Sequence, residues 1–225
     1  MIVYGKQVVL YILEKHPHLI EEIYLTKEID KKLFLKFSKV GKKIIRPEFK
    51  KAQAMAKGGN HQGFLLKISD IPPRDIDELK RSSFLLLLYN LTDIGNIGSI
   101  IRTAYALGVD GVIISGVKSI NFASLIRTSS AAAIEMPIAF CHEPLSLINE
   151  LGQVGFERVV ADMSGKDVRE CSFLDKKVLI VGSEGEGIPR KVLKNCDKVV
   201  KIKMQREFDS LNVSVATAIL CDRIR

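Results

Sequence analysis

Six apolar segments in the C-terminal part of the chain constrain its fold most strongly. Each is a continuous run of apolar residues rather than an alternating one, and helical patterns separate most of them. The six predicted strands are residues 84–91, 111–115, 136–140, 158–162, 177–182 and 198–204. Continuous apolar strands between helices are typical of parallel sheets that are buried on both faces. We therefore expect an α/β fold, with helices on both faces of a largely parallel sheet.

The N-terminal part predicts a smaller α/β domain over residues 1–70. Its expected helices are residues 6–15, 31–38 and 47–56, and its expected strands are residues 22–25, 43–45 and 63–68. Residues 71–83 combine adjacent prolines with charged residues and have no apolar period, which is typical of a linker. The larger domain then spans residues 84–225.

Basic residues are concentrated in the N-terminal part. Residues 1–82 hold 17 Lys and Arg against 10 Asp and Glu, whereas residues 83–225 hold 17 against 16. Within residues 32–57, nine basic residues accompany one acid, Glu48. This density favours contact with a nucleic-acid backbone, although a solvated lysine-rich face has the same composition. The residues expected to bind RNA are Lys36, Lys39, Lys42, Lys43, Arg46, Lys50 and Lys51.

Other features predict a cytosolic protein without a metal site. No apolar run has the length of a membrane span, and the N-terminus lacks a signal-peptide pattern. The four cysteines are widely spaced and form no CxxC motif, and the four histidines have no zinc-like spacing with them. We expect neither disulfides nor bound metal, and a cytoplasmic location with no membrane partner.

The loops after residues 91, 182 and 204 are the expected site of chemistry, because ligands of such sheets bind beyond the carboxyl ends of the strands. The second loop, GSEGEGIP over residues 182–189, has the glycines of a phosphate-binding loop. Glu184 and Glu186 would repel a phosphate, so this loop is better suited to a cation or a hydroxyl group.

Polar residues begin the helices after the other two loops. Asn96 can cap the helix that ends near Leu107 or contact a ligand, and Arg102 lies in its second turn, where a guanidinium can reach a phosphate. Ser210 is a candidate N-cap for the last helix, which is apolar on nearly every side. We expect that helix to be buried in the core or against a partner chain, and Asn212 to be hydrogen-bonded to backbone or ligand.

Several common enzyme classes do not fit these loops. Val181 occupies the first glycine position of a GxSxG motif, which argues against serine hydrolysis. Neither GxGxxG after a first strand nor GxxxxGK[ST] is present, which argues against nucleotide-phosphate enzymes, including dinucleotide-dependent oxidoreductases.

Three segments, in order and spacing, resemble the motifs of the SpoU family of RNA 2′-O-ribose methyltransferases. They are NIGSIIRTA at 96–104, LIVGSEGEGIP at 179–189 and IKMQREFDSLNVSVATAI at 202–219. VYGKQVV near the N-terminus and HQGF at 61–64 resemble the substrate-binding domain of the family's ribosomal-RNA branch. Lys203, Arg206 and Ile94 depart from the pattern, since proline, glycine and proline respectively are common at those positions.

The resemblance implies a catalytic domain with a C-terminal trefoil knot, S-adenosyl-L-methionine as cofactor and a homodimer. By motif position it implies catalytic or substrate-positioning roles for Asn96, Arg102, Glu184, Ser210 and Asn212. It implies a cofactor site at Gly182, Ile202, Met204 and Leu211. The expected activity is 2′-O-methylation of a guanosine in 23S ribosomal RNA. A tRNA methyltransferase and a non-catalytic RNA-binding ribosome-assembly factor are the alternatives.

Overall fold

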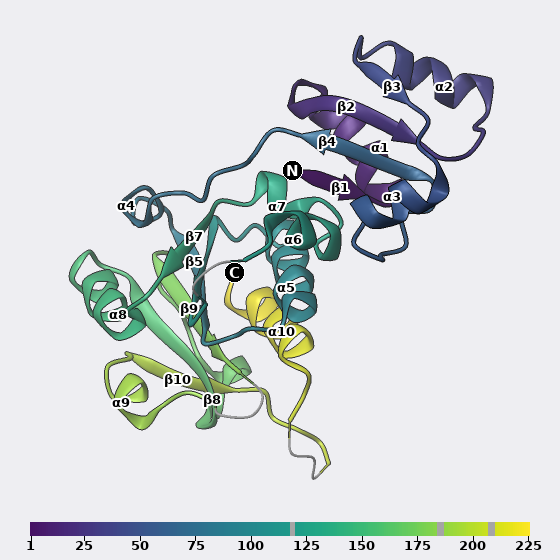
Figure 1. The fold of residues 1–225 in the computed structure, drawn as a ribbon. Coiled ribbons are helices and arrows are strands. Elements are labelled where there is room, and N and C mark those ends of the chain that lie inside the picture. The colour runs from purple at the N-terminus through teal and green to yellow at the C-terminus, as the bar shows by residue number, and fades with distance from the viewer. Residues whose placement is uncertain (118–119, 184–186, 207–209) are drawn as a thin grey trace. The chain divides into compact units, whose positions relative to one another are not determined.

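The computed structural model describes residues 1–117, 120–183, 187–206 and 210–225. The chain divides into two compact units (Figure 1). The first contains Met1–Pro72 and Asn121–Ala131, and the second contains Pro73–Ile120 and Ala132–Arg225. In the described part of the chain, no helix is both long enough and apolar enough to span a membrane.

The first unit is built on a four-stranded sheet of order β1-β4-β2-β3. Only β2 and β3 are parallel, and β4 is antiparallel to both of its neighbours. The strands are β1 (Ile2–Tyr4), β2 (Ile20–Leu25), β3 (Lys43–Ile45) and β4 (Phe64–Ile68), and the helices are α1 (Lys6–Lys15), η1 (Pro17–Leu19), α2 (Lys31–Ser38), α3 (Phe49–Met55) and α6 (Phe122–Thr128).

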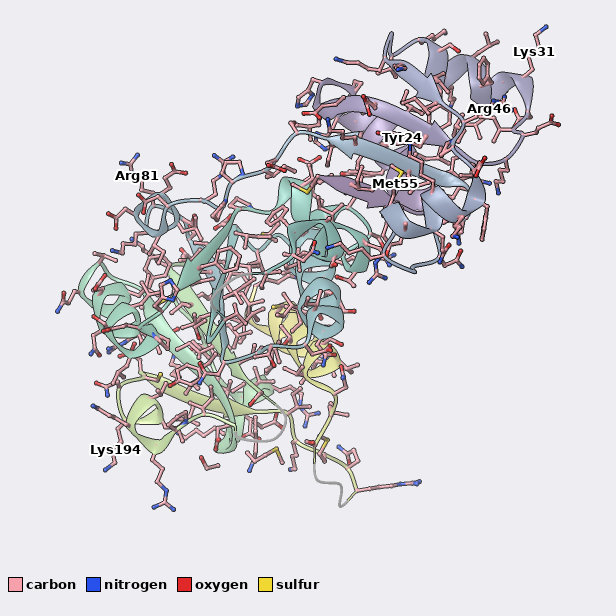
Figure 2. All side chains as sticks on the ribbon, viewed as in Figure 1. Tyr24, Lys31, Arg46, Met55, Arg81 and Lys194 are labelled. Atoms are coloured by element: carbon pink, nitrogen blue, oxygen red, sulfur yellow. The ribbon has the colours of Figure 1, made fainter. Side chains whose placement is uncertain are left out.

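A small apolar cluster joins α3 to this sheet. Tyr24 of β2 and Leu65 of β4 are buried with Ala52 of α3, and Met55 packs against them (Figure 2). The helix α6 comes from a distant part of the sequence and packs against β1 in the same unit.

The second unit contains a six-stranded sheet of order β10-β8-β9-β5-β6-β7, and every neighbouring pair is parallel. The strands are β5 (Phe84–Tyr89), β6 (Gly111–Ser115), β7 (Ile138–Cys141), β8 (Glu157–Asp167), β9 (Lys177–Gly182) and β10 (Lys198–Lys201). Its helices are α4 (Ile76–Leu79), α5 (Ile94–Ala106), α7 (Ala132–Glu135), α8 (Pro144–Gln153), η2 (Val168–Glu170), α9 (Arg190–Leu193) and α10 (Val213–Ile224).

Helices cover both faces of this sheet. The helices α8 and α9 lie on one face, and α5 and α10 lie on the other (Figure 1). Leu147, Ile148 and Val192 of the first pair of helices pack with Leu87 and Ile180 of the strands in one buried cluster. On the opposite face α5 and α10 pack against each other. Both faces of the sheet are thus buried, as its continuous apolar strands predict, and the expected fold class is confirmed.

Several elements differ from expectation. The strand β1 was not predicted, because three residues are too few for a periodic pattern. The strand β8 extends to Asp167, and its pairing with β10 skips from Val160 to Lys166. Residues 161–165 leave the ladder there, so their polar sequence does not resemble a buried strand. The short helix α4 forms within residues 71–83 and buries Leu79.

Candidate active site

A cavity of about 190 Å³ lies at the carboxyl ends of β8, β9 and β10. Its described walls come from four segments that are distant in sequence. The lining residues include Ala161, Asp162 and Met163 of β8, just beyond its last pair with β9, Gly182, Ser183, Gly187 and Ile188 around β9, Lys201, Ile202 and Met204 around β10, and Ser210, Leu211, Val213, Ala216, Thr217 and Leu220 at α10. Parallel α/β sheets bind ligands in this position.

The loop after β9 is closed at its base by its own backbone. Gly187 donates to the carbonyl of Ser183 at 3.1 Å, and these two residues form an isolated bridge. A Cβ atom on Gly182 would lie 2.8 Å from the Gly187 carbonyl oxygen, so this strand end requires glycine. The predicted catalytic residue Glu184, together with Glu186, lies outside the described residues.

All four residues expected to bind the cofactor line this cavity. Gly182 contributes from the end of β9, Ile202 and Met204 from the segment after β10, and Leu211 from the segment before α10. Asp162 is the one carboxylate and Lys201 the one ammonium group among the described lining residues. The rest of the wall is largely apolar, which suits a flat aromatic group.

The helix α5 begins earlier than expected. Its N-cap is Asp93, whose carboxylate accepts from the backbone N–H of Asn96 at 2.7 Å. Asn96 therefore lies in the first turn and does not cap the helix, because the side chain three residues earlier already satisfies its N–H. Arg102 lies on the exposed face of the same helix. Neither Asn96 nor Arg102 is among the cavity-lining residues.

Asn212, not Ser210, caps α10. The Oδ1 atom of Asn212 accepts from the backbone N–H of Ser214 at 3.0 Å, and Nδ2 donates to Oδ1 of Asn96 at 3.1 Å. Ser210 lies two residues before the cap and lines the cavity instead. Asn212 is exposed, and so is Val215, at 48%. The start of α10 is therefore only partly covered by the rest of this chain, and the predicted burial against a partner chain stays a prediction.

An ion pair lies at the end of β8. The Arg169 guanidinium, 2.6 Å from the buried carboxylate of Asp167, holds the pKa of that carboxyl at about 2 through its hydrogen bonds. The positive charge of Lys203 lowers the same pKa further. Lys203 stands at a position where proline is common in the family, and its charge favours the ionised form of Asp167 at the end of β8. In α10, burial raises the pKa of the Cys221 thiol to about 12.

The seven residues expected to bind RNA lie in the first unit, and all of them are exposed. They belong to α2, β3, α3 and the segments between these elements. Figure 2 shows Arg46 in this region, together with Lys31, which begins α2. The seven exposed residues expected to bind RNA are Lys36, Lys39, Lys42, Lys43, Arg46, Lys50 and Lys51.

Two cavity walls were missed from the sequence. The wall at residues 161–163 lies at the carboxyl end of the predicted strand 158–162, so the rule used for the other three loops would also have indicated Asp162. The wall formed by α10 had no such signal. Val213, Ala216, Thr217 and Leu220 share one helix face at i, i+3, i+4 and i+7, but apolar residues surround this helix and hide the face.

The cavity suits the cofactor that the resemblance implies. S-adenosyl-L-methionine has a flat adenine ring, which apolar side chains such as Ile202, Leu211 and Leu220 can enclose. The absence of a side chain at Gly182 lets the Gly187 carbonyl and the Ile188 side chain close against the end of β9, which shapes this wall of the cavity. Among the described residues, no cluster of three or more His, Cys, Asp or Glu could hold a metal ion.

Comparisons with known proteins identify the family of this chain. Residues 83–222 match the SpoU rRNA Methylase family, and residues 2–73 match the family described as RNA 2′-O ribose methyltransferase substrate binding. An uncharacterized tRNA/rRNA methyltransferase of Borreliella burgdorferi is 32% identical over 81% of this chain and 87% of its own length. The 23S rRNA (guanosine-2′-O-)-methyltransferase RlmB of Neisseria meningitidis is 29% identical over 99% of this chain and 94% of its own length.

The fold is also that of a solved family member. The SpoU methyltransferase AviRb of Streptomyces viridochromogenes, crystallised with AdoMet, aligns with a TM-score of 0.78 at 22% identity and covers 99% of this chain and 88% of its own. The chain therefore belongs to the SpoU rRNA methylase family and is an S-adenosyl-L-methionine-dependent RNA methyltransferase.

Proposed function

We propose that this enzyme transfers a methyl group to the ribose 2′-hydroxyl of a guanosine in 23S ribosomal RNA. One observation carries the proposal. The Asn212–Asn96 hydrogen bond ties the start of α5, the helix of Arg102, to the segment that lines the cavity. The choice of RNA rests on the relative from Neisseria meningitidis, which spans nearly the whole chain, and on the match of the N-terminal residues to a substrate-binding family.

The chemistry requires an activated hydroxyl in line with the donor methyl. A ribose hydroxyl is a very weak acid, so the site must stabilise negative charge as the proton leaves. An arginine with a pKa above roughly 12 is a poor proton acceptor. We assign Arg102 to bind a phosphate beside the target ribose and to stabilise the developing oxyanion. The bound cofactor supplies an electrophilic methyl group on a sulfonium.

The remaining predicted residues take supporting roles in this proposal. Asn96 and Asn212 fix the relative position of α5 and α10 through their shared hydrogen bond. Ser210 contributes a hydroxyl to the cavity wall, close in sequence to Asn212. Glu184 orients Arg102 or the ribose. Gly182, Ile202, Met204 and Leu211 hold the cofactor.

We also propose that the active form is a cytoplasmic homodimer with a C-terminal trefoil knot. Support for the dimer comes from apolar side chains that the isolated chain leaves open to water. Val215 of α10 is 48% exposed, and Tyr105 of α5 is 45% exposed. Both lie on helices that pack against each other, so a second copy could cover both. Sedimentation velocity of the purified protein would test this state.

The test of the activity is a comparison of ribosomal RNA from cells with and without this protein. Alkaline hydrolysis of RNA needs a free 2′-hydroxyl, so the chain is not cleaved on the 3′ side of a 2′-O-methylated nucleotide. Sequencing of the hydrolysed RNA therefore maps each methylated site. We expect one guanosine of 23S RNA to lose its methyl group, and the purified enzyme with cofactor to restore it. Loss of a tRNA methyl group instead would favour the tRNA alternative. A folded protein that does not bind the cofactor in a titration would favour the assembly factor.

A further inference from the structure

A second recess lies in the first unit, all of whose residues the structure describes. It has a volume of about 550 Å³, within the roughly 300–1,000 Å³ of small-molecule sites. Three segments form it: Thr26 and Lys27 after β2, Phe49 and Gln53 on α3, and the loop Gly58–Gly63 before β4.

His61 gives this recess an unused hydrogen-bond donor. Its imidazole is 3% exposed, and Nδ1 accepts from the backbone N–H of Gly63 at 3.1 Å. That bond places the proton of a neutral ring on Nε2. Nε2 is buried, and no described residue accepts a hydrogen bond from it. Buried donors are nearly always satisfied, so this one indicates an acceptor that the chain itself does not supply.

An exposed aromatic ring stands beside that donor. Phe49 is 70% exposed, and its ring centroid lies 5.5 Å from the imidazole of His61, tilted by 47°. A single exposed phenylalanine is ordinary on a protein surface. Here the ring flanks a buried polar group, and its exposure allows it to change rotamer when a ligand approaches the imidazole.

The charge of the recess selects an anionic ligand. No acidic residue is among those that line it. The aliphatic stem of Lys27 crosses Gly63, where a Cβ atom would lie 2.7 Å from the lysine Cγ, and the ammonium sits 5.0 Å from the centroid of the Phe64 ring. Lys50 and Lys51 follow Phe49 on α3, and both are exposed. A recess that holds an exposed aromatic ring and one lysine suits a base attached to a phosphate backbone.

We propose that this recess binds one unpaired nucleotide of the RNA substrate. Phe49 stacks on the base, Nε2–H of His61 donates to an acceptor on the base edge, and Lys27 contacts the adjoining phosphate. A base inside a duplex has neither face free for Phe49, so the nucleotide must come from a loop, bulge or single-stranded end. The inference rests on the proposed function in taking RNA as the ligand, and it adds where and in which form the RNA is bound.

The test uses the full-length enzyme and a fluorescent single-stranded RNA of about 12 nucleotides, with the same sequence in a duplex for comparison. Binding is followed by anisotropy. We expect Phe49→Ala to weaken single-strand binding about tenfold, or ~1.4 kcal/mol, and Phe49→Trp to retain it. His61→Asn can keep the bond to Gly63 N–H in an Asx turn but lacks the Nε2 donor, so a several-fold loss is expected.

Leu35→Ala is the matched control, since Leu35 is also an exposed apolar residue of this unit, at 51%, but lies outside the recess. It should bind RNA like the wild type. Thermal melting checks that each variant folds. If His61→Asn does not fold, the comparison of wild type, Phe49→Ala and Phe49→Trp decides whether the recess binds a nucleotide. The proposal would be overturned if Phe49→Ala lost as much affinity for the duplex as for the single strand. It would also be overturned if Phe49→Ala bound the single strand as tightly as wild type does.

Methylation of 23S RNA by the same proteins separates this inference from the proposed function. Wild-type RNA binding by Phe49→Ala, in an enzyme that methylates 23S RNA, would remove the subsite and leave the function standing. Single-strand binding that depends on Phe49, in an enzyme that methylates no ribosomal RNA, would remove the function and leave the subsite standing.

Discussion

The amide group of Asn212 donates a hydrogen bond to Oδ1 of Asn96 at 3.1 Å, although the two residues are 116 positions apart. The oxygen of the same amide caps α10 by accepting from Ser214 N–H. One side chain therefore stabilises the start of α10 and ties it to the start of α5. The segment just before Asn212 lines the cavity, so this contact links the start of α5 to one wall of that cavity.

Asn212→Ser should separate the two roles of this side chain. Serine caps helices about as well as asparagine does, but it is too short to reach Asn96. We expect Asn212→Ser to lose less than about 1 kcal/mol of unfolding free energy, and Asn212→Ala to lose about 1 kcal/mol more. Methyl transfer should fall about 10- to 100-fold in both variants, because a small displacement of α5 misplaces its reactive side chains. Urea unfolding and single-turnover assays would measure these effects.

A double-mutant cycle with Asn96→Ala identifies the contact responsible. If the hydrogen bond accounts for the loss of rate, Asn96→Ala and the double variant should be about equally slow. Wild-type rates for Asn212→Ser would show that the bond does not position α5.

Arg102→Lys should slow methyl transfer about 100-fold without changing cofactor affinity. Lysine keeps the charge but loses the planar, bidentate group that suits a phosphate. Loss of one donor to a developing oxyanion typically costs about 100- to 1,000-fold. Cofactor affinity should persist because Arg102 does not line the cavity. Arg190→Ala, which removes an exposed arginine elsewhere in the same unit, is the control for overall charge. Normal RNA binding and near-native methylation by Arg102→Ala would refute the role.

Gly182→Ala should weaken cofactor binding. The added methyl group would lie 2.8 Å from both the Gly187 carbonyl oxygen and the Ile188 Cδ1, so the base of the β9 loop must shift. We expect a loss of at least tenfold in affinity by calorimetry, together with a smaller thermal stabilisation by the cofactor. Gly95→Ala is the matched control, because its Cβ would meet only the Asp93 carboxylate oxygen, at 3.2 Å. Equal cofactor affinity in both variants would show that the packing of the loop base against Gly182 does not shape the cofactor site.

The strands of the second unit were predictable because each has its own local signal. Residues 111–115 and 177–182 were predicted with the bounds that β6 and β9 have in the structure. Burial on both faces makes every position of such a strand apolar, so a short window suffices. The four residues expected to bind the cofactor follow from motif resemblance, and all four line one cavity.

What the sequence did not predict depends on contacts between distant segments. The cap of α5 is Asp93 rather than Asn96, and both residue types suit an N-cap, so only the backbone geometry decides. The break in β8 depends on the approach of Gly165 to the backbone of Val199 in another strand. The unpaired donor of His61 follows from burial by three segments, which no local pattern records.

Asp167→Asn should make the free energy of unfolding depend less on pH between about pH 4 and pH 2. The folded pKa is about 2, mainly because of hydrogen bonds from Arg169, whereas an unfolded aspartate titrates near 3.9. Since the folded value is lower, ionised Asp167 stabilises the fold above about pH 4, and that contribution disappears as the pH falls from about 4 to 2. The variant should be less stable than wild type at neutral pH, and the difference should shrink over that range. Urea unfolding midpoints at successive pH values would measure it.

Arg169→Gln gives an independent check, because it removes the main cause of the low pKa and keeps the carboxylate. Its stability difference from wild type should shrink over the same pH range. A constant difference between Asp167→Asn and wild type from neutral pH to about pH 2 would show that this carboxyl is not coupled to folding.

Alkylation of Cys221 should report opening of α10. The thiol is fully buried, and burial raises its pKa to about 12, so iodoacetamide at about pH 8 can react only after the helix separates from the core. Val213, Ala216, Thr217 and Leu220 of this helix line the cavity, so bound cofactor should oppose that opening.

Cofactor at about 100 times its dissociation constant should slow labelling of Cys221 about 100-fold, provided that the open form does not bind it. Cys171 is the internal reference, because it is only half-buried and does not line the cavity. Its rate of labelling, read by mass spectrometry of the same samples, should not change. If the cofactor binds by calorimetry yet leaves the labelling of Cys221 unchanged, α10 does not form a wall of the cofactor site.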